Sequence, residues 1–200
     1  KSRLYNIAAT LLAAFIEQGR YFTRMVVTVQ KEVAQRMFAS VGSKDYSSFT
    51  VLCNSVYKVT PLMILKGASF YPPPHVDSQA VRLDLREDRT SHQETALFYS
   101  MVRALFANRR KTIKNNLTVF IAAQNRRSIQ KRNGSTHKEA VLSRPPDATQ
   151  SDPSELASTI LHTAGIDERA RAEQLSLESF RTIAMILETF YDNSGKPSTP

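Results

Sequence analysis

One segment of the sequence places aromatic rings beside a rigid backbone: Phe70 and Tyr71 precede three prolines, 72–74, and His75. Proline fixes φ and lacks a backbone N–H, so three in a row can neither continue a helix nor pair inside a sheet. We therefore predict a stiff, extended loop that presents flat aromatic surfaces. Such surfaces can stack on a nucleobase. From the residues alone, the alternative that Phe70 and Tyr71 cover the edge of a sheet is favoured.

A second group of residues could bind a polyanion. Basic side chains are densest in Arg109-Arg110-Lys111-Thr112-Ile113-Lys114, and four more follow between positions 126 and 132. The net charge is +9, and residues 91–153 carry 11 basic but only 4 acidic side chains. Charge alone leaves a phosphate-binding surface and a solvated face equally open. We favour a nucleic acid, because we place the first run on a helix with no acidic residues interleaved.

Other kinds of site have little support. The single cysteine, Cys53, cannot form an internal disulfide and lies in an apolar run that resembles a strand, so we interpret it as a buried small hydrophobe. The four histidines are scattered without ligand spacing, and we expect no metal site. The longest apolar stretch, residues 7–16, is about half the length that crosses a bilayer. With no recognisable signal peptide either, we expect a soluble, cytoplasmic protein.

Residues 1–90 combine the patterns of helices and strands. Residues 7–18 predict a buried helix that stops at Gly19, and residues 31–39 predict a short amphipathic helix. Runs rich in β-branched residues predict an interior strand at 25–30 and further strands at 49–57 and 79–85. Alternating strands and helices are typical of an α/β domain.

After residue 90 the patterns are helical only. Apolar residues at helical spacing predict helices at 94–107, 111–124, 153–165 and 176–191, the last with Ser176 as its N-cap. Residues 125–153 are polar and basic, which predicts a flexible insertion, and residues 193–200 predict a disordered tail. The expected organisation is an α/β domain in residues 1–90 followed by a small all-α domain in residues 91–192.

Several short segments are more informative in their order than singly. They are Tyr5-Asn6-Ile7, then Gln30-Lys31-Glu32-Val33-Ala34 with Arg36 and Gly42-Ser43-Lys44, then Phe70 to Ser78, then Leu105-Phe106 with Arg109-Arg110-Lys111 and Asn115-Asn116-Leu117, and finally Arg171 to Leu177. Together they resemble the rRNA adenine dimethyltransferase family, which methylates two adjacent adenosines near the 3′ end of small-subunit rRNA. The resemblance covers almost the whole chain apart from the predicted insertion and tail.

The resemblance implies the C-terminal half of a Rossmann-like methyltransferase domain that uses S-adenosylmethionine, followed by the small all-α domain. The family's glycine-rich loop and the acidic residue that holds the cofactor ribose do not occur here, and none of the six glycines forms a G-x-G. We therefore expect a fragment that holds the cofactor poorly and is inactive by itself.

By the same resemblance, Phe70 stacks on an adenine that has left its helix. The opposite wall is Asn-Leu-Pro-Tyr in the family and Ser2-Arg3-Leu4-Tyr5 here, so Ser2 and Tyr5 join Phe70 as candidate catalytic residues. Ser2 is also the candidate contact to the cofactor. Serine can accept a hydrogen bond, whereas losing proline removes a fixed turn. Whether the motif is altered or is not represented by the first residues stays open.

The candidate RNA contacts are then Arg109, Arg110, Lys111 and Lys114. The expected partner is small-subunit rRNA or an immature small ribosomal subunit. We expect the protein to be a monomer that does not bind a membrane. One alternative is a catalytically inactive RNA-binding ribosome-assembly factor, suggested by the missing half and the altered motif. Another is the related large-subunit rRNA adenine methyltransferase, which shares the aromatic-proline loop, although residues 30–34 and 42–44 look closer to the small-subunit enzymes.

Overall fold

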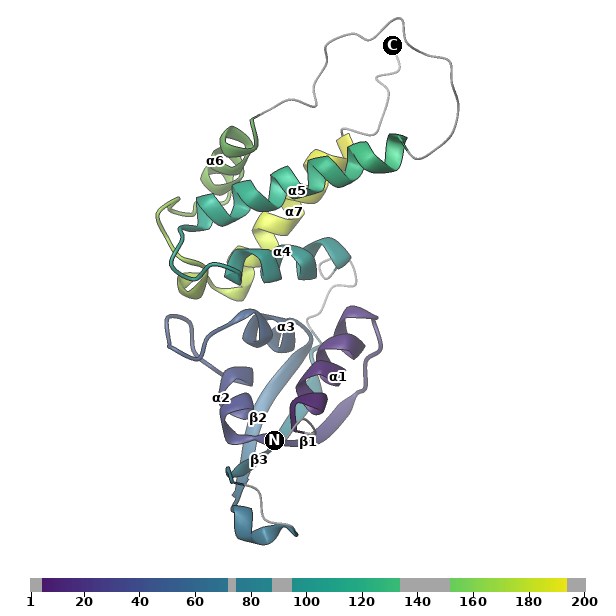
Figure 1. The fold of residues 1–200 in the computed structure, drawn as a ribbon, viewed down its shortest axis with the longest axis vertical. Helices are drawn as coiled ribbons and strands as arrows, with labels where there is room; N and C mark the ends of the chain where they lie inside the picture. Colours follow the sequence, from purple (N-terminus) through teal and green to yellow (C-terminus); the bar gives the residue numbers. More distant parts are fainter. Residues whose placement is uncertain (1–4, 72–74, 88–94, 134–151, 194–200) are drawn as a thin grey trace, which may run out of the picture.

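The structure, a computed structural model, describes residues 5–71, 75–87, 95–133 and 152–193 (Figure 1). These residues form a sheet part and a helical part. The sheet part contains α1 (Tyr5–Glu17), β1 (Arg24–Gln30), α2 (Lys31–Met37), α3 (Ser48–Val56), β2 (Tyr57–Leu65), the 3-10 turn η1 (Gly67–Ser69) and β3 (Ser78–Leu85). The helical part contains α4 (Ala96–Phe106), α5 (Ile113–Asn133), α6 (Pro153–Thr163), the 3-10 turn η2 (Ala172–Gln174) and α7 (Leu177–Asn193).

The described strands form an antiparallel sheet in the order β1-β3-β2. Gln30 and Leu65 both lie opposite Ser78, so the ends of β1 and β2 meet the start of β3 at one edge of the sheet. Strands at 25–30 and 79–85 were predicted and are confirmed. The prediction that 25–30 is interior is wrong for the described residues, because β1 lies at the side of the sheet.

The two faces of the sheet differ in character. Val29, Val81 and Leu83 are buried on the face against which α1, α2 and α3 pack. On the opposite face Asp84 binds the guanidinium groups of Arg24 and Arg82, so that face is charged within the described part of the chain. These arginines lower the pKa of Asp84, the hydrogen bond from Arg24 most of all. Helices packed on one face of a sheet confirm the predicted α/β class as a mixed α/β fold.

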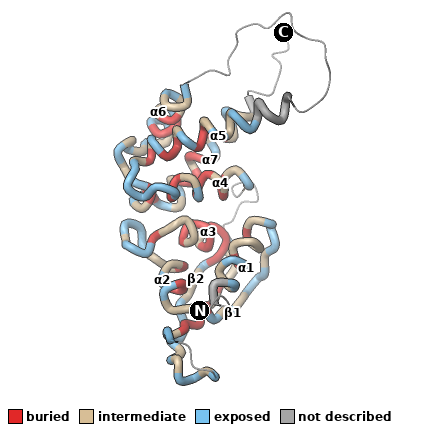
Figure 2. The backbone as a smooth tube through the Cα atoms, viewed as in Figure 1, coloured by how far each residue is buried: buried red, intermediate tan, exposed pale blue. Residues whose placement is uncertain are grey.

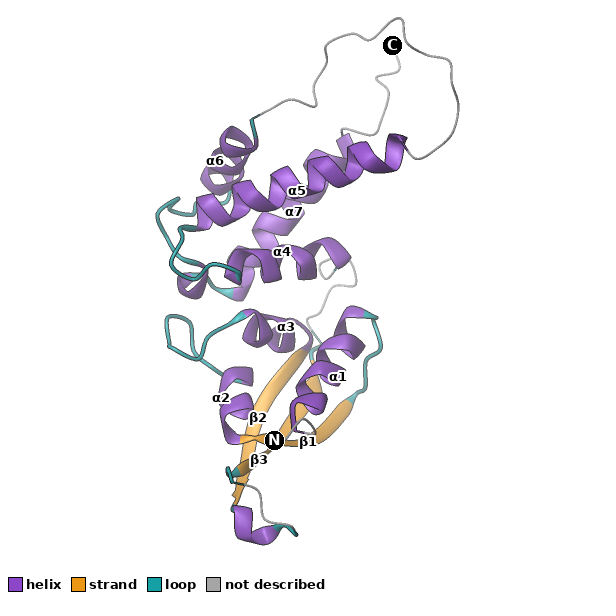
Figure 3. Cartoon of the chain, in the orientation of Figure 1, coloured by secondary structure: helices purple, strands orange, loops and turns teal. Residues whose placement is uncertain are grey.

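Helix α3 replaces the strand that residues 49–57 predict, and that prediction is wrong (Figure 3). The backbone N–H of Ser47 donates to Thr50 Oγ1 at 3.0 Å, which caps the start of the helix. Six of its nine residues are buried, so no polar stripe reveals the helical period. Cys53 is buried here, and burial raises the pKa of its thiol, which confirms its interpretation as a small hydrophobe. β2, which begins at Tyr57, is a strand that the sequence did not reveal.

Helix α1 has a buried and an open side. Leu12 and Ile16 are buried, whereas Ile7 and Leu11 are half exposed, so the prediction of a helix buried all round is wrong. Gly19 ends the helix as predicted: its φ is +69°, and Arg20 N donates to Phe15 O at 2.8 Å beyond it.

The helical part confirms predicted helices at α4, α6 and α7 and corrects the insertion. Ser176 caps α7, accepting a hydrogen bond from Ser179 N at 3.1 Å. Helix α5 continues to Asn133 and α6 begins at Pro153, so residues 125–133 are helical rather than a flexible insertion. Residues 134–151 and 194–200, which include most of the predicted insertion and tail, lie outside the described residues.

One buried cluster runs through both parts. Figure 2 shows buried segments of α3 and α4 facing the junction, and the buried cluster includes residues from Leu12 in α1 to Leu187 in α7. At the junction the rings of Phe106 and Phe180 stack with centroids 5.7 Å apart, and Tyr46 approaches Phe106 at 5.9 Å. An ion pair between Glu17 of α1 and Arg103 of α4 adds a link at the surface. The two parts therefore share a core.

Candidate nucleic-acid interface

The aromatic loop lies at the edge of the sheet where β2 ends and β3 begins, at the bottom of Figure 1. Lys66 Nζ and Asp77 Oδ2 are 3.0 Å apart and close the loop at its base. Within it, Phe70 N donates to Gly67 O at 3.1 Å, and the Phe70 side chain is half-buried. Tyr71 is fully exposed. Residues 72–74 lie outside the described residues, so the predicted stiffness of the proline run stays a prediction.

Charged and polar groups interact at the base of this loop. The hydrogen bond from the Lys66 ammonium is the main reason that the pKa of Asp77 lies below its usual value, and the charge of Lys31 contributes. Lys31 N also donates to Asp77 O at 3.0 Å, which ties the start of α2 to the loop. The Oγ of Ser78 is buried and has no hydrogen-bond partner among the described residues.

The start of α1 approaches the same edge of the sheet. Figure 1 shows the helix beginning near the lower edge, where Gln30 and Ser78 pair, and running away from it. Tyr5 is its first residue, but its side chain is not described, and Ser2 lies outside the described residues. That Tyr5 and Phe70 face one another therefore stays a prediction.

The basic run occupies a different position from the predicted one. Residues 107–112 form the turn between α4 and α5, so the prediction that Arg109, Arg110 and Lys111 sit on a helix is wrong. Asn116 fixes this turn: its side chain is buried, and its Nδ2 donates to Leu105 O at 2.9 Å and to Asn108 O at 3.2 Å. One of the two arguments for a nucleic-acid partner is thereby lost.

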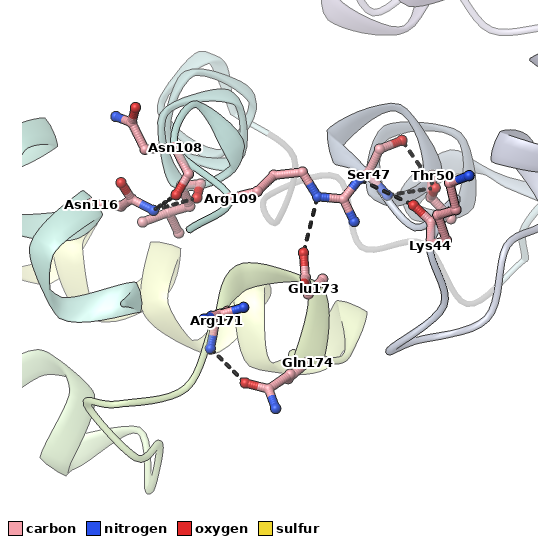
Figure 4. Close-up of polar contacts among 10 residues, drawn as sticks. Lys44, Ser47, Thr50, Asn108, Arg109, Asn116, Arg171, Glu173 and Gln174 are labelled. Atoms are coloured by element: carbon pink, nitrogen blue, oxygen red, sulfur yellow. Dashed lines mark hydrogen bonds and ion pairs between the residues drawn. The ribbon is translucent and has the colours of Figure 1, made fainter. Parts of the chain in front are cut away.

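The four candidate cations differ in what they contact. Arg109 Nε lies 3.0 Å from Glu173 Oε2, and Arg109 Nη1 donates to Lys44 O at 3.1 Å (Figure 4). Lys114 Nζ pairs with Glu168 Oε2 at 2.9 Å, and this hydrogen bond is the main cause of the lowered pKa of Glu168.

Arg110 and Lys111 are exposed, and the described residues show no ion pair for either side chain. They are therefore the members of the run that can meet a phosphate without first breaking a contact.

The aromatic loop lies at the end of the sheet far from the helical part, whereas the basic turn lies beside the junction of the two parts, where Arg109 bonds Lys44 (Figure 1). Strand β2, which runs from the junction toward the loop, spans roughly 26 Å at the usual rise per residue. A single nucleotide cannot contact both sites. A structured polynucleotide can, because its phosphates extend over many ångströms.

Comparison with known proteins fixes the family. The family model for ribosomal RNA adenine dimethylase matches residues 4–152. The chain belongs to this family. Ribosomal RNA small subunit methyltransferase A of Treponema pallidum is 41% identical over 180 residues, which is 90% of this chain and 54% of that protein. The chain thus spans about half the length of such relatives.

Solved structures of related enzymes share the fold. A dimethyladenosine transferase from Plasmodium falciparum superimposes with a TM-score of 0.70 and 22% identity, covering 94% of this chain and 65% of that one. The 23S rRNA methyltransferase ErmE gives a TM-score of 0.50 and 18% identity, covering 92% and 62%. At these identities the likeness shows the fold alone.

Dimethylases of this family use S-adenosylmethionine, and neither of two cavities beside α3 has the size expected of a site for it. Cavities of about 150 and 230 Å³ lie beside α3, away from the Phe70 loop. Both are smaller than the roughly 300 Å³ at which ligand pockets begin. The buried Oγ of Ser78 is one polar atom and cannot define a nucleotide site. No described helix is both long and apolar enough to span a bilayer, and no cluster of metal-ligating side chains occurs in the described part of the chain.

Two partners of Arg109 escaped the sequence analysis. Lys44 and Glu173 both fall in segments that carry the family resemblance, yet neither had a role assigned. Their contacts with Arg109 join positions 65 and 64 residues apart. Such separations leave no periodic signal, and the resemblance of the two segments to the family was the one sequence feature at these positions.

Proposed function

We propose that the chain is the adenine-holding and RNA-binding portion of a small-subunit rRNA adenine N6,N6-dimethyltransferase that acts on adjacent adenosines near the 3′ end of that RNA. The family match over residues 4–152 carries the proposal. The name of the Treponema pallidum relative supports the small subunit as the substrate. The finer architecture belongs to the same proposal: residues 1–90 are the C-terminal half of a Rossmann-like domain and residues 91–192 a helical RNA-binding domain.

Phe70 is the residue that holds the target base in this proposal. Modifying the exocyclic amine of adenine requires the base to leave its stack, which costs a few kcal/mol. Stacking on an aromatic side chain returns about 1–3 kcal/mol. Phe70 fits this role because its ring lies in a loop closed by Lys66 and Asp77 and is only half-buried. Tyr5 and Ser2 form the opposite wall, with a Ser2 oxygen accepting a hydrogen bond from the amine.

Arg110 and Lys111 bind the RNA backbone in this proposal. Both side chains are exposed at a turn that Asn116 fixes, so little conformational entropy of the backbone is lost when phosphates bind. Lys114 contributes its charge from the neighbouring turn of α5 while paired with Glu168. The partner is small-subunit rRNA or an immature small ribosomal subunit, and the protein acts as a monomer. S-adenosylmethionine is the methyl donor, with Ser2 as its contact in this chain.

Methyl transfer tests the proposal. The chain and its Phe70→Ala variant are incubated with labelled S-adenosylmethionine and immature small subunits, and label in the rRNA is counted alongside RNA binding. Incorporation that Phe70→Ala abolishes supports the proposal. Tight binding without incorporation is expected both of a fragment that holds the cofactor poorly and of a ribosome-assembly factor, which the altered Ser2-to-Tyr5 motif favours, so incorporation is the result that excludes the assembly factor. Preferential labelling of large subunits would overturn the assignment of the substrate.

A further inference from the structure

The three segments that meet at Arg109 come from both parts of the molecule. Arg109 lies in the α4–α5 turn, Lys44 in the loop between α2 and α3, and Glu173 in η2. Its guanidinium bonds both acceptors at once, at 3.1 Å to Lys44 O and 3.0 Å to the Glu173 carboxylate. Figure 4 shows the side chain reaching across the junction between them.

The backbone supports the same junction. Gly42 N donates to Glu173 O at 2.7 Å, so the loop that carries Lys44 also bonds η2 directly. Gly42 has a φ of +80°, a conformation that glycine adopts without strain. The Glu173 side chain thus binds Arg109, while its backbone carbonyl binds Gly42 of the sheet part. Both bonds lie at the contact between the sheet part and the helical part.

We infer that Arg109 is a positioning residue, which holds the sheet part against the helical part through Lys44 and Glu173 and thereby fixes the distance from the Phe70 loop to Arg110 and Lys111. The inference rests on the proposed function for its consequence in RNA binding. In this inference Arg109 is not a phosphate ligand, because its Nε and Nη1 groups bond protein acceptors and the Glu173 carboxylate offsets its charge.

The sign of the Glu173→Ala effect separates the two roles. If Arg109 binds phosphate, removing a neighbouring carboxylate frees it and tightens RNA binding, since phosphates repel acids. If Arg109 positions the two parts, Glu173→Ala loosens the junction and weakens RNA binding although the surface becomes more basic. Loss of a partly exposed ion pair of this kind should weaken RNA binding by about two- to fivefold.

The experiment titrates an oligonucleotide copying the 3′ end of small-subunit rRNA at several salt concentrations. Arg109→Ala and Glu173→Ala should weaken binding by similar factors, non-additively, with an unchanged salt slope. Arg110→Ala, the control in the same turn, should lower the slope by about 0.7–0.9. Arg109→Lys should not restore affinity, because one ammonium cannot reproduce the forked contact. Tighter binding by Glu173→Ala, or a lower slope for Arg109→Ala, overturns the inference.

Hydrogen exchange tests the junction without RNA. In Glu173→Ala and Arg109→Ala the amide of Gly42 should exchange several times faster than in the parent protein, while Arg110→Ala leaves it unchanged. Unchanged exchange in the first two variants removes the positioning role. An absence of RNA binding by the parent protein would instead count against the proposed function and leave the exchange result interpretable.

Discussion

The hydroxyl of Tyr46 donates a hydrogen bond to the carbonyl oxygen of Leu175 at 2.9 Å, across 129 residues of sequence. Tyr46 lies in the loop between α2 and α3, and Leu175 follows η2, so the bond joins the sheet part to the helical part. Both residues are buried, and the Tyr46 ring packs against Phe106. Because water cannot replace a lost partner in this position, the bond should matter for stability.

Tyr46→Phe should lower the free energy of unfolding by about 1–3 kcal/mol, since the ring stays but the Leu175 carbonyl loses its donor. Urea denaturation followed by circular dichroism measures this. Tyr71→Phe is the matched control, because that tyrosine is fully exposed, and it should change stability by less than about 0.5 kcal/mol. Equal effects of both variants would show that the buried bond contributes nothing.

Alkaline pH should weaken the parent protein through the same tyrosine. Burial raises the pKa of Tyr46 to about 12, above the ordinary value of 10.0. Between these values the native state binds more protons than the unfolded state, so this contribution is complete below pH 10 and is lost as the pH rises toward 12. Urea midpoints measured from pH 9 to 11.5 should fall more steeply in the parent than in Tyr46→Phe. Parallel curves would contradict the assignment.

How far the sequence predicted this structure depends on whether polar residues alternate with apolar ones at a regular period within an element. β3 and α7 each show a clear apolar period and were predicted within a few residues. Helix α3 was taken for a strand because burial on most sides erases its period. The basic run that begins at Arg109 was placed on a helix, because the turn that holds it depends on the tertiary bonds of Asn116. The partner of Arg109 was equally hidden, because Glu173 lies 64 residues away.

Asp77→Asn should loosen the base of the aromatic loop. The Asp77 carboxylate pairs with Lys66, which lowers its pKa in the native state. As the pH falls, the unfolded state therefore binds more protons than the native state. The contribution is therefore present above about pH 4 and is lost below it. The stability difference between the parent and Asp77→Asn, measured by urea denaturation, should vanish as the pH drops from 6 to 3. Asp45→Asn, in an exposed loop position, serves as the control and should change the free energy of unfolding at pH 6 by less than about 0.5 kcal/mol.

Phe70→Leu should weaken binding of the 3′-end oligonucleotide by about 1–3 kcal/mol, because leucine keeps the apolar volume but cannot stack on a base. Phe70→Tyr should bind like the parent. The loss should disappear when the adjacent adenosines are replaced by abasic sites, which have no ring to hold. Tyr71→Leu is the neighbouring control, and a loss in that variant with none in Phe70→Leu would transfer the stacking role to Tyr71.

Arg181 joins α7 to the end of α3 from a buried position. Its Nη2 donates to Ser55 O at 3.1 Å and its Nη1 to Glu178 Oε1 at 2.8 Å, with 7% of the residue exposed. Arg181→Ala removes a donor from a carbonyl at the end of α3 and leaves a cavity, so the free energy of unfolding should fall by about 2–4 kcal/mol.

Arg24→Ala is the matched control for Arg181→Ala, because the Arg24 side chain is 67% exposed where it pairs with Asp84. It should cost less than about 1 kcal/mol. Since the two parts share one core, urea denaturation of Arg181→Ala should remain a single transition at a lower midpoint. Two separate transitions would mean that the sheet part and the helical part unfold independently, and that the contacts across the junction do not couple them.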